Sequence, residues 1–489
     1  HSRLLLKFSI RYAPAGFSND SPNTNIVKNG SFIDHSYFPT IGYNEGIELR
    51  DDSIRHRHGL KAANALPTLE SARAHPGDQA FDDGRVNLDI TVGTAPDQTA
   101  IVPGRLVKEW MENGHHYFQY KTDTPVLNEF SINSARYQIK RDQWKDVNLE
   151  LYYHRGHEFN LDRMLSSMKA TLQYCSEKFS PYQFHQLTIV EFPRYHDFSI
   201  SLPGTIPVSE GVDFITHVDP KQKDSFDFPF YATAKQIGLQ WWGGQVVPAP
   251  VEGASAVTEP LAEYTALMVM KHYYGPEMLK SFLRQELDRY LSSRAREHNR
   301  ESPLVRVQDG QFYIDHSKAS LVMYALQDYI GEDQVNMALA SFLKAYTVPN
   351  AHPTSLDLLS YLRKATPPDL QYLLDDLFVD ITLYDNRAVS ATSTHAADGK
   401  YRVHLTVESR KYHVDGRGQE QEIPVRDWID IGILDANGHY LYLRKQKIEQ
   451  ETNIFDLIVD GEPAQAGIDP ANKLIDRQPD DNTIKVHVN

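Results

Sequence analysis

The spacing of apolar residues changes twice along this 489-residue chain, and this change is the strongest constraint on its fold. Up to about residue 155, apolar and polar side chains alternate, as they do in half-buried strands. Between about 156 and 380, apolar residues recur at three- and four-residue intervals, which is the spacing of amphipathic helices. Alternation returns from 381 to 489. The sequence therefore predicts an α+β fold in three parts, at 1–155, 156–380 and 381–489.

The first part is expected to be a β-domain that is truncated at its start. The chain begins at His1, without a methionine, and alternates like a strand from Leu4 onward (LLLKFSI). Because a natural chain rarely begins inside a strand, we expect an excised fragment of a longer protein. Strands are predicted at 85–92, 116–120, 129–139 and 147–154, with one short helix near 68–74.

The middle part is predicted to be mostly helical, and the last part to be a small β-sandwich. Helices are predicted at 161–178, 229–246, 257–273, 276–294, 317–330, 332–346, 354–364 and 368–378, with one strand at 187–192. Strands return at 401–408, 428–434, 440–446 and 453–459. The Asn-Gly pair in Asp435–Gly438 predicts a hairpin turn between two of these strands.

Composition excludes several classes of protein. Asp and Glu number 65 against 50 Lys and Arg, which gives a net charge of −15. Since affinity for phosphate comes from clustered cations, this balance argues against a nucleic-acid partner. The single cysteine, Cys175, excludes an internal disulfide and a cysteine-built zinc site. The sequence holds no run of 18 apolar residues, so we expect no membrane-spanning helix in it.

The most informative motifs lie between residues 209 and 320. Gln240–Gly243 reads QWWG, and Thr258 and Glu259 follow at the head of the next predicted helix. Here the chain resembles the aminopeptidase N family, the thermolysin-like gluzincin zinc metallopeptidases. That family carries HExxHxWxG on one helix and a zinc-binding Glu on a second. Glu210 falls where the family binds the substrate amine, and 315–320 falls where it has Tyr-x-Lys-Gly.

The similarity is strongest to a bacterial subgroup in which this domain is fused behind the membrane domain of an ABC transporter permease. Residues 320–333, 375–387 and 467–482 resemble that subgroup. The resemblance implies a thermolysin-like, mostly helical domain with a small sheet between the two β-rich parts. It also implies a soluble domain of a bacterial inner-membrane protein, with the side of the membrane left open. The permease domain of the same polypeptide would then be its partner, together with a peptide or another protein.

The zinc motif itself has been lost. Aligned on QWWG, HExxH falls on KQIGL, so Lys235 and Leu239 replace the two histidine ligands. A protonated ammonium does not coordinate zinc, and leucine offers no lone pair. Gln236 replaces the glutamate base, and an amide does not titrate in a useful range. Glu259 alone remains of the three ligands, and His316 replaces the oxyanion-binding tyrosine.

These losses together predict a catalytically inactive pseudopeptidase with no zinc cofactor. We expect it to act as a binding or regulatory module of the permease, with Glu210 as a substrate-binding residue. We also expect the Lys235 ammonium to pair with Glu259 and to replace part of the charge of the lost ion. Two other functions remain open: an active zinc-dependent aminopeptidase with a variant metal site, and a purely structural module.

Simpler interpretations of the same residues stay open as well. KQIGLQWWGG also fits an ordinary amphipathic helix, and Glu259 also fits a helix-capping carboxylate. Glu210 also fits a solvated loop, and His316 a hydrogen-bonded structural role. Among the 21 histidines, His154 and His157 flank a turn and are able to chelate, but from sequence a structural role is favoured.

The other histidine pairs point to no metal site. His115 and His116 are adjacent, so on a strand they would face opposite sides of the sheet. His56 and His58 are expected in a polar, solvent-facing loop.

Overall fold

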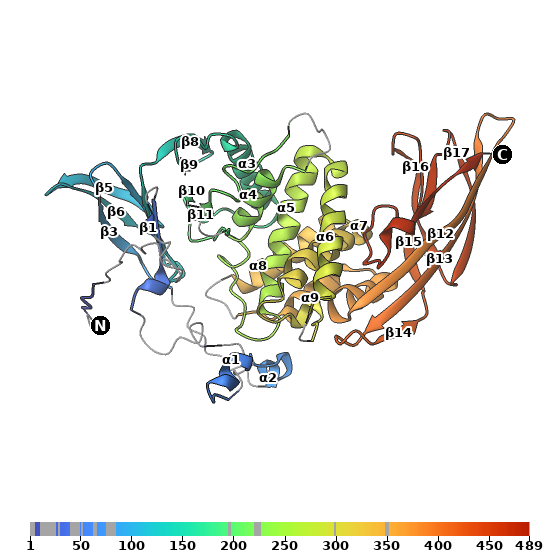
Figure 1. Cartoon of the computed structure of the whole chain (residues 1–489), viewed down its shortest axis with the longest axis horizontal. Helices are drawn as coiled ribbons and strands as arrows, with labels where there is room; N and C mark the ends of the chain where they lie inside the picture. Colours follow the sequence, from blue (N-terminus) through green and yellow to red (C-terminus); the bar gives the residue numbers. More distant parts are fainter. Residues whose placement is uncertain are drawn as a thin grey trace.

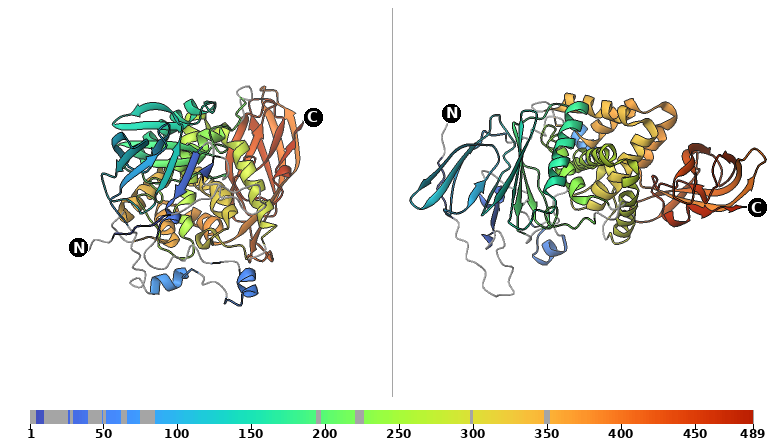
Figure 2. Two further views of the ribbon diagram at one scale, coloured as in Figure 1. Left: turned by 60° about the vertical axis from the view of Figure 1, so that its left-hand side comes forward. Right: turned by 90° about the horizontal axis from the view of Figure 1, so that it is seen from above.

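The computed structural model describes residues 5–9, 26–27, 30–39, 49, 52–61, 66–74, 85–193, 197–219, 226–297, 300–347 and 352–488. Sheets from the first part of the chain, a block of helices and the C-terminal sheets follow one another in a row (Figures 1 and 2). The predicted mixed α+β class is therefore confirmed.

The first part contains two small antiparallel sheets. One has the order β3-β6-β5, and the other has the order β1-β2-β7-β4. Their strands are β1 (Ile26–Val27), β2 (Gly30–Asp34), β3 (Asp89–Thr94), β4 (Thr99–Ile101), β5 (Arg105–Glu112), β6 (His115–Lys121) and β7 (Ser131–Ala135). A short 3-10 turn, η1, spans His35–Tyr37.

Several expectations for this part need correction. The strand predicted at 129–139 is divided between β7 and β8 (Gln138–Trp144), which belong to different sheets. Of the strand predicted from Leu4, residues 5–9 are described, and they are exposed and form no strand. His56 lies on a short helix, α1 (Asp52–Arg57), and not in a loop. The helix predicted near 68–74 is present as α2 (Leu69–Ala74).

A four-stranded sheet leads into the helices and brings three strand ends together. Its order is β11-β10-β9-β8, with β9 at Val147–Tyr153, β10 at Gln186–Phe192 and β11 at Thr205–Ser209. β10 pairs in parallel with both of its neighbours. Helix α3 (Leu161–Lys178) connects β9 to β10, and its bounds are those predicted from the sequence. The carboxyl ends of β9, β10 and β11 therefore meet at one edge of the sheet.

The helices that follow enclose the largest hydrophobic core, in which Trp241 and Trp242 are fully buried. They are α4 (Phe228–Gly238), α5 (Glu259–Tyr274), α6 (Leu279–Arg294), α7 (Ala319–Ile330), α8 (Glu332–Tyr346), α9 (Ser355–Ala365) and α10 (Gln371–Leu374). Short 3-10 or π-helical turns lie between them, at η3 (Ala254–Val257), η4 (Pro276–Met278), η5 (Leu304–Arg306), η6 (Tyr313–Lys318), η7 (Pro368–Leu370) and η8 (Asp375–Val379).

Helix α4 ends eight residues before its predicted end at 246, because the chain turns sharply after Gly238. Gly243 has φ +129°, a region that L side chains rarely adopt. A Cβ on Gly244 would lie 2.2 Å from the carbonyl oxygen of Gln240. The two glycines thus permit a turn that no larger residue would allow.

The C-terminal part consists of two sheets that pack around a separate core, as expected for a β-sandwich. One sheet contains β12 (Thr382–His395), β13 (Tyr401–Val414), β14 (Glu420–Ile423), β17 (Thr452–Val459) and β20 (His487–Val488). The other contains β15 (Asp427–Leu434), β16 (Tyr440–Ile448), β18 (Gln465–Ile468) and β19 (Thr483–Lys485). A 3-10 turn, η9, spans Pro479–Asp481. The predicted turn joins β15 to β16, with Gly438 at φ +81°.

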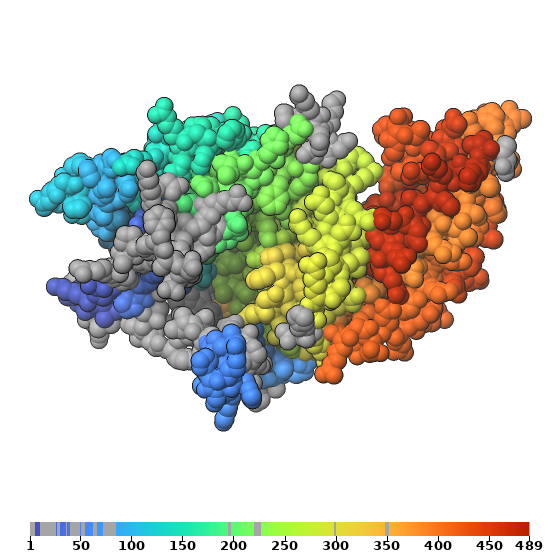
Figure 3. All heavy atoms as spheres, viewed as in Figure 1, coloured from blue at the N-terminus to red at the C-terminus, as the bar shows by residue number. Residues whose placement is uncertain are grey.

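Charged side chains tie this lobe to the helices. Asp328 on α7 accepts from the Lys473 ammonium at 2.8 Å, and Tyr329 donates to the carbonyl of Trp428 at 2.7 Å. In the space-filling view the C-terminal lobe lies directly against the helices (Figure 3). Among the described residues, no helix is both long and apolar enough to cross a bilayer.

Candidate functional site

Lys235 lies at the centre of a charged cluster where helices α4 and α5 face each other. Its Nζ is 3.2 Å from a carboxylate oxygen of Glu259 and 2.8 Å from one of Glu263. The Lys235 side chain is 15% exposed, Glu259 24% and Glu263 3%. The ion pair between Lys235 and Glu259 that the sequence predicts is therefore present, and a second carboxylate joins it.

The two carboxylates keep the Lys235 side chain charged. Burial alone would lower the pKa of Lys235, because it disfavours the ammonium form. Glu263 and Glu259 outweigh this effect and raise the pKa of Lys235 above its ordinary value. An ammonium held in this way has no lone pair for a metal ion. Chemically, the cluster is a largely buried salt bridge between one ammonium and two carboxylates.

His316 closes the same cluster from the π-helical turn η6. Its Nδ1 lies 3.2 Å from Lys235 Nζ and 3.4 Å from Glu259 Oε2. Because an ammonium only donates hydrogen bonds, the Lys235 contact uses Nδ1 as an acceptor. The His316 ring also stacks on Phe312 with centroids 5.8 Å apart. His316 therefore takes part in the charge network.

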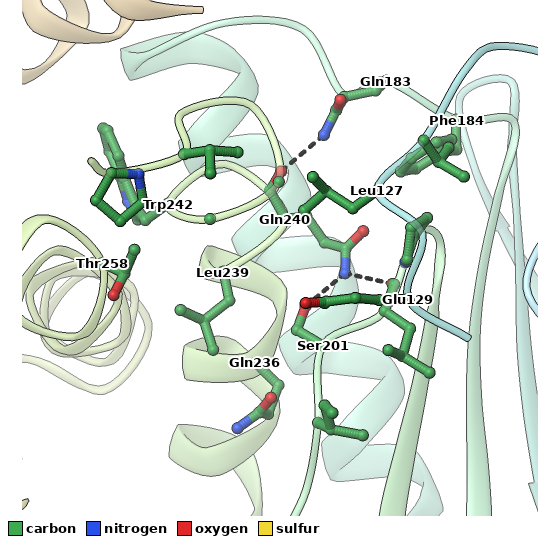
Figure 4. A pocket seen from close by; sticks show the side chains of 18 of the residues that line it. Leu127, Glu129, Gln183, Phe184, Ser201, Gln236, Leu239, Gln240, Trp242 and Thr258 are labelled. Carbon is green, nitrogen blue, oxygen red and sulfur yellow. Dashed lines mark hydrogen bonds between the residues drawn. The ribbon is translucent and has the colours of Figure 1, made fainter. Parts of the chain in front are cut away.

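Gln236 and Leu239 line a pocket of about 520 Å³ next to this cluster. Glu259 and His316 line the same pocket, and Leu127, Glu129 and Phe184 form part of its wall (Figure 4). The Gln236 Oε1 atom is buried and has no hydrogen-bond partner among the described residues. The structure brings together five of the six predicted site residues: Lys235, Gln236, Leu239, Glu259 and His316.

Glu210, the sixth, lies just after β11 and turns toward a different group of side chains. Its carboxylate is 4.0 Å from His157 Nδ1, and its side chain is 17% exposed. Ligand atoms of His154 and Glu191 lie close by. The use of Glu210 for a substrate amine stays a prediction.

The QWWG motif has a structural role. The Gln240 amide donates to Ser201 Oγ at 2.5 Å and to the Leu202 carbonyl at 3.0 Å, and its oxygen accepts from Gly204 N at 3.0 Å (Figure 4). Trp242 Nε1 donates to Thr265 Oγ1 at 2.9 Å, which ties the turn to α5. These bonds hold the end of α4 against its neighbours, and so they position Lys235.

Sequence reasoning missed Glu263. It lies four residues after Glu259, so both carboxylates share one face of α5. Tyr231 donates a hydrogen bond to it, and Ser320 Oγ lies 3.3 Å away. A charged residue inside an otherwise apolar helix was the available signal, because such a residue needs a buried partner.

Comparison with known proteins supports the fold. No protein-family model matches the chain, and no curated protein matches it by sequence. A crystal structure of Legionella pneumophila aminopeptidase A in complex with aspartic acid is similar, with a TM-score of 0.54 and 14% identity. The match covers 83% of this chain but only 45% of that one. At this identity the likeness concerns the fold alone, which is peptidase-like.

Proposed function

We propose that this chain is a catalytically inactive aminopeptidase-like domain that serves as a binding or regulatory module of an ABC-type permease. The observation that carries the proposal is the Lys235 ammonium, 3.2 Å from Glu259 and 2.8 Å from Glu263. It fills the position of the first zinc ligand with a positive charge that satisfies both carboxylates. The association with a permease rests on the sequence resemblance.

The residues present fit neither zinc nor the peptidase reaction. Glu259 is the one zinc-binding residue of the family pattern that is retained, and it is already paired. The Gln236 amide is not a base that deprotonates water. What remains is a pocket of about 520 Å³ lined by both apolar and polar side chains, and its volume lies in the usual range of small-ligand sites.

Peptide binding tests this proposal. We expect short peptides to bind the purified chain weakly in calorimetry, with no hydrolysis product formed during the titration. Gln236→Ala should weaken binding, because the Gln236 side chain lines the pocket. Gln143→Ala, on the exposed face of β8, is the matched control and should bind like the wild type. Hydrolysis of the peptides would contradict the proposal, and an absence of binding at millimolar concentration would reduce the module to a structural one.

A further inference from the structure

A second cluster of chemically reactive side chains lies at the carboxyl edge of the parallel sheet. It contains two imidazoles and two carboxylates, from His154, His157, Glu191 and Glu210. One ligand atom from each residue lies within 4.8 Å of all the others. The Lys235 cluster shares no residue with this group, so the proposed function leaves it unexplained.

The topology of the sheet brings these four residues together. His154 follows the last residue of β9, Glu191 lies at the end of β10, and Glu210 follows β11. Because these strands are parallel, their carboxyl ends deliver all three residues to one edge. His157 joins them through a turn in which its N–H donates to the His154 carbonyl at 3.0 Å. Gly156 provides the positive φ of +96° that this turn requires.

The cluster is buried around a single carboxylate. The Glu191 side chain is fully buried, whereas His154 is 12% and His157 26% exposed. Glu191 Oε2 accepts from the backbone N–H of His154 at 2.6 Å and lies 3.2 Å from His154 Nδ1. His157 Nδ1 forms a hydrogen bond with Glu191 Oε1. The buried carboxylate therefore holds the His157 ring by a hydrogen bond, and the Nδ1 atom of His154 lies close to the same charge.

We propose that His154, His157, Glu191 and Glu210 form a binding site for a divalent transition-metal cation of the zinc class. Imidazole nitrogen and carboxylate oxygen are ligands that zinc uses in proteins. Bond lengths of about 2.0–2.2 Å place the ligand atoms of tetrahedral zinc about 3.4 Å apart. Two of the separations here, 3.2 Å and 4.0 Å, lie on either side of that value, and all four ligand atoms lie within 4.8 Å of one another. Small side-chain shifts would thus close the site around an ion.

Four protein ligands make this a structural site, because a catalytic zinc keeps one position open for water or substrate. The ion would fix Glu210 at the end of β11. The next two residues, Gly211 and Val212, line a hollow of about 680 Å³ that Lys235 and His316 also line. Metal binding would therefore order the wall of this hollow, and the ion itself would catalyse no reaction.

Titration of zinc into the chelator-treated full chain tests the site. Calorimetry should show one saturable site, and thermal unfolding should move to higher temperature with added zinc. His157→Gln and, separately, Glu210→Gln should weaken zinc binding by more than about tenfold, since even outer-shell partners of metal ligands contribute that much. His185→Gln is the matched control, because His185 is an exposed histidine paired with Asp146. It should leave the affinity unchanged.

A second variant distinguishes this site from the Lys235 cluster. Glu259→Gln should retain the zinc affinity of the wild type. Loss of binding in Glu259→Gln, with retention in His157→Gln, would place the ion at the Lys235 cluster and overturn both proposals. An absence of saturable binding in the wild type, or equal affinity in His157→Gln, Glu210→Gln and His185→Gln, would overturn the metal site alone.

Cobalt supplies an independent readout of the same site. Tetrahedral coordination of cobalt by the four residues predicts intense visible absorption, and His157→Gln should remove it.

Discussion

At the scale of single residues, Lys235 carries a positive charge between two carboxylates, Glu259 and Glu263. A buried carboxylate without a partner is costly, and its pKa rises until it becomes neutral. Glu263 is 3% exposed and Glu259 24%, so Glu263 depends more strongly on the ammonium. Lys235, Glu259 and Glu263 thus form one compensated arrangement.

Removal of the Lys235 charge should destabilise the fold. Lys235→Met leaves Glu263 buried and unpaired, and we expect a loss of roughly 3 kcal/mol in the free energy of unfolding. In a Glu263→Gln background, Lys235→Met should lower the free energy of unfolding much less, because the variant has no buried carboxylate at position 263 to be left unpaired. Urea unfolding of the four variants measures this coupling.

Lys169→Met is the control for this cycle. Lys169 is 40% exposed and pairs with Asp142, so its loss should change stability by less than about 1 kcal/mol. Equal losses for Lys235→Met in the wild-type and Glu263→Gln backgrounds would show that the two residues are not coupled.

Asp213, three residues after Glu210, predicts a specific dependence of stability on pH. Its side chain is fully buried, and burial raises its pKa to about 8. A carboxyl whose folded pKa is raised binds its proton more tightly in the folded state. Its contribution is therefore complete below the unfolded pKa near 4 and is lost as pH rises through about 8.

Asp213→Asn should remove this dependence. Between about pH 5 and 8, the free energy of unfolding of the variant should fall less steeply than that of the wild type, by up to about 1.4 kcal/mol per pH unit. Chemical denaturation at a series of pH values provides the measurement. Asp146→Asn, at a carboxylate that is 76% exposed, should keep the wild-type slope. An unchanged slope in Asp213→Asn would contradict the assignment.

At the scale of secondary-structure elements, the position of Lys235 depends on the turn that ends α4. Gln240 alone makes three hydrogen bonds to the segment from Ser201 to Gly204, and it is 3% exposed. The motif that suggested an active site thus serves to join a helix to a sheet.

Gln240→Ala should therefore destabilise the chain by roughly 2–3 kcal/mol, because it leaves buried backbone groups without partners. Gln236→Ala is a matched control one turn earlier on α4, where the side-chain oxygen has no partner among the described residues. It should cost less than about 1 kcal/mol. Thermal unfolding of the two variants measures this difference in stability. Equal losses of stability in Gln240→Ala and Gln236→Ala would contradict a structural role for the motif.

Helices and strands whose apolar residues recur at regular intervals could be predicted from the sequence. Features that depend on contacts between residues far apart in the chain could not. Helix α3 matches its predicted bounds at Leu161–Lys178, because its buried stripe is continuous. Strand β5 was missed because seven of its eight side chains are exposed and four of them are charged, which hides any alternation. The end of α4 was misplaced because the glycine turn is set by close packing and not by periodicity. Glu191 drew no attention, since only the parallel sheet brings it to two histidines.

At the scale of the whole molecule, sheets, a block of helices and further sheets are arranged in a row (Figure 1). The candidate site lies inside the helical region but is not built by it alone. Leu127 and Glu129, which precede β7, and Phe184, which precedes β10, complete the pocket opposite Gln236. Sequence motifs located the helical half of this pocket, and long-range folding supplies the other half.

Aminopeptidase activity of the whole chain tests the central claim most directly. The wild type should turn over no aminoacyl-anilide substrate, with or without added zinc, because the Lys235 ammonium does not coordinate zinc and the Gln236 amide does not deprotonate water. Lys235→His with Leu239→His should gain little activity. Addition of Gln236→Glu and His316→Tyr should give measurable activity that a chelator abolishes. Wild-type turnover that a chelator abolishes would contradict the account.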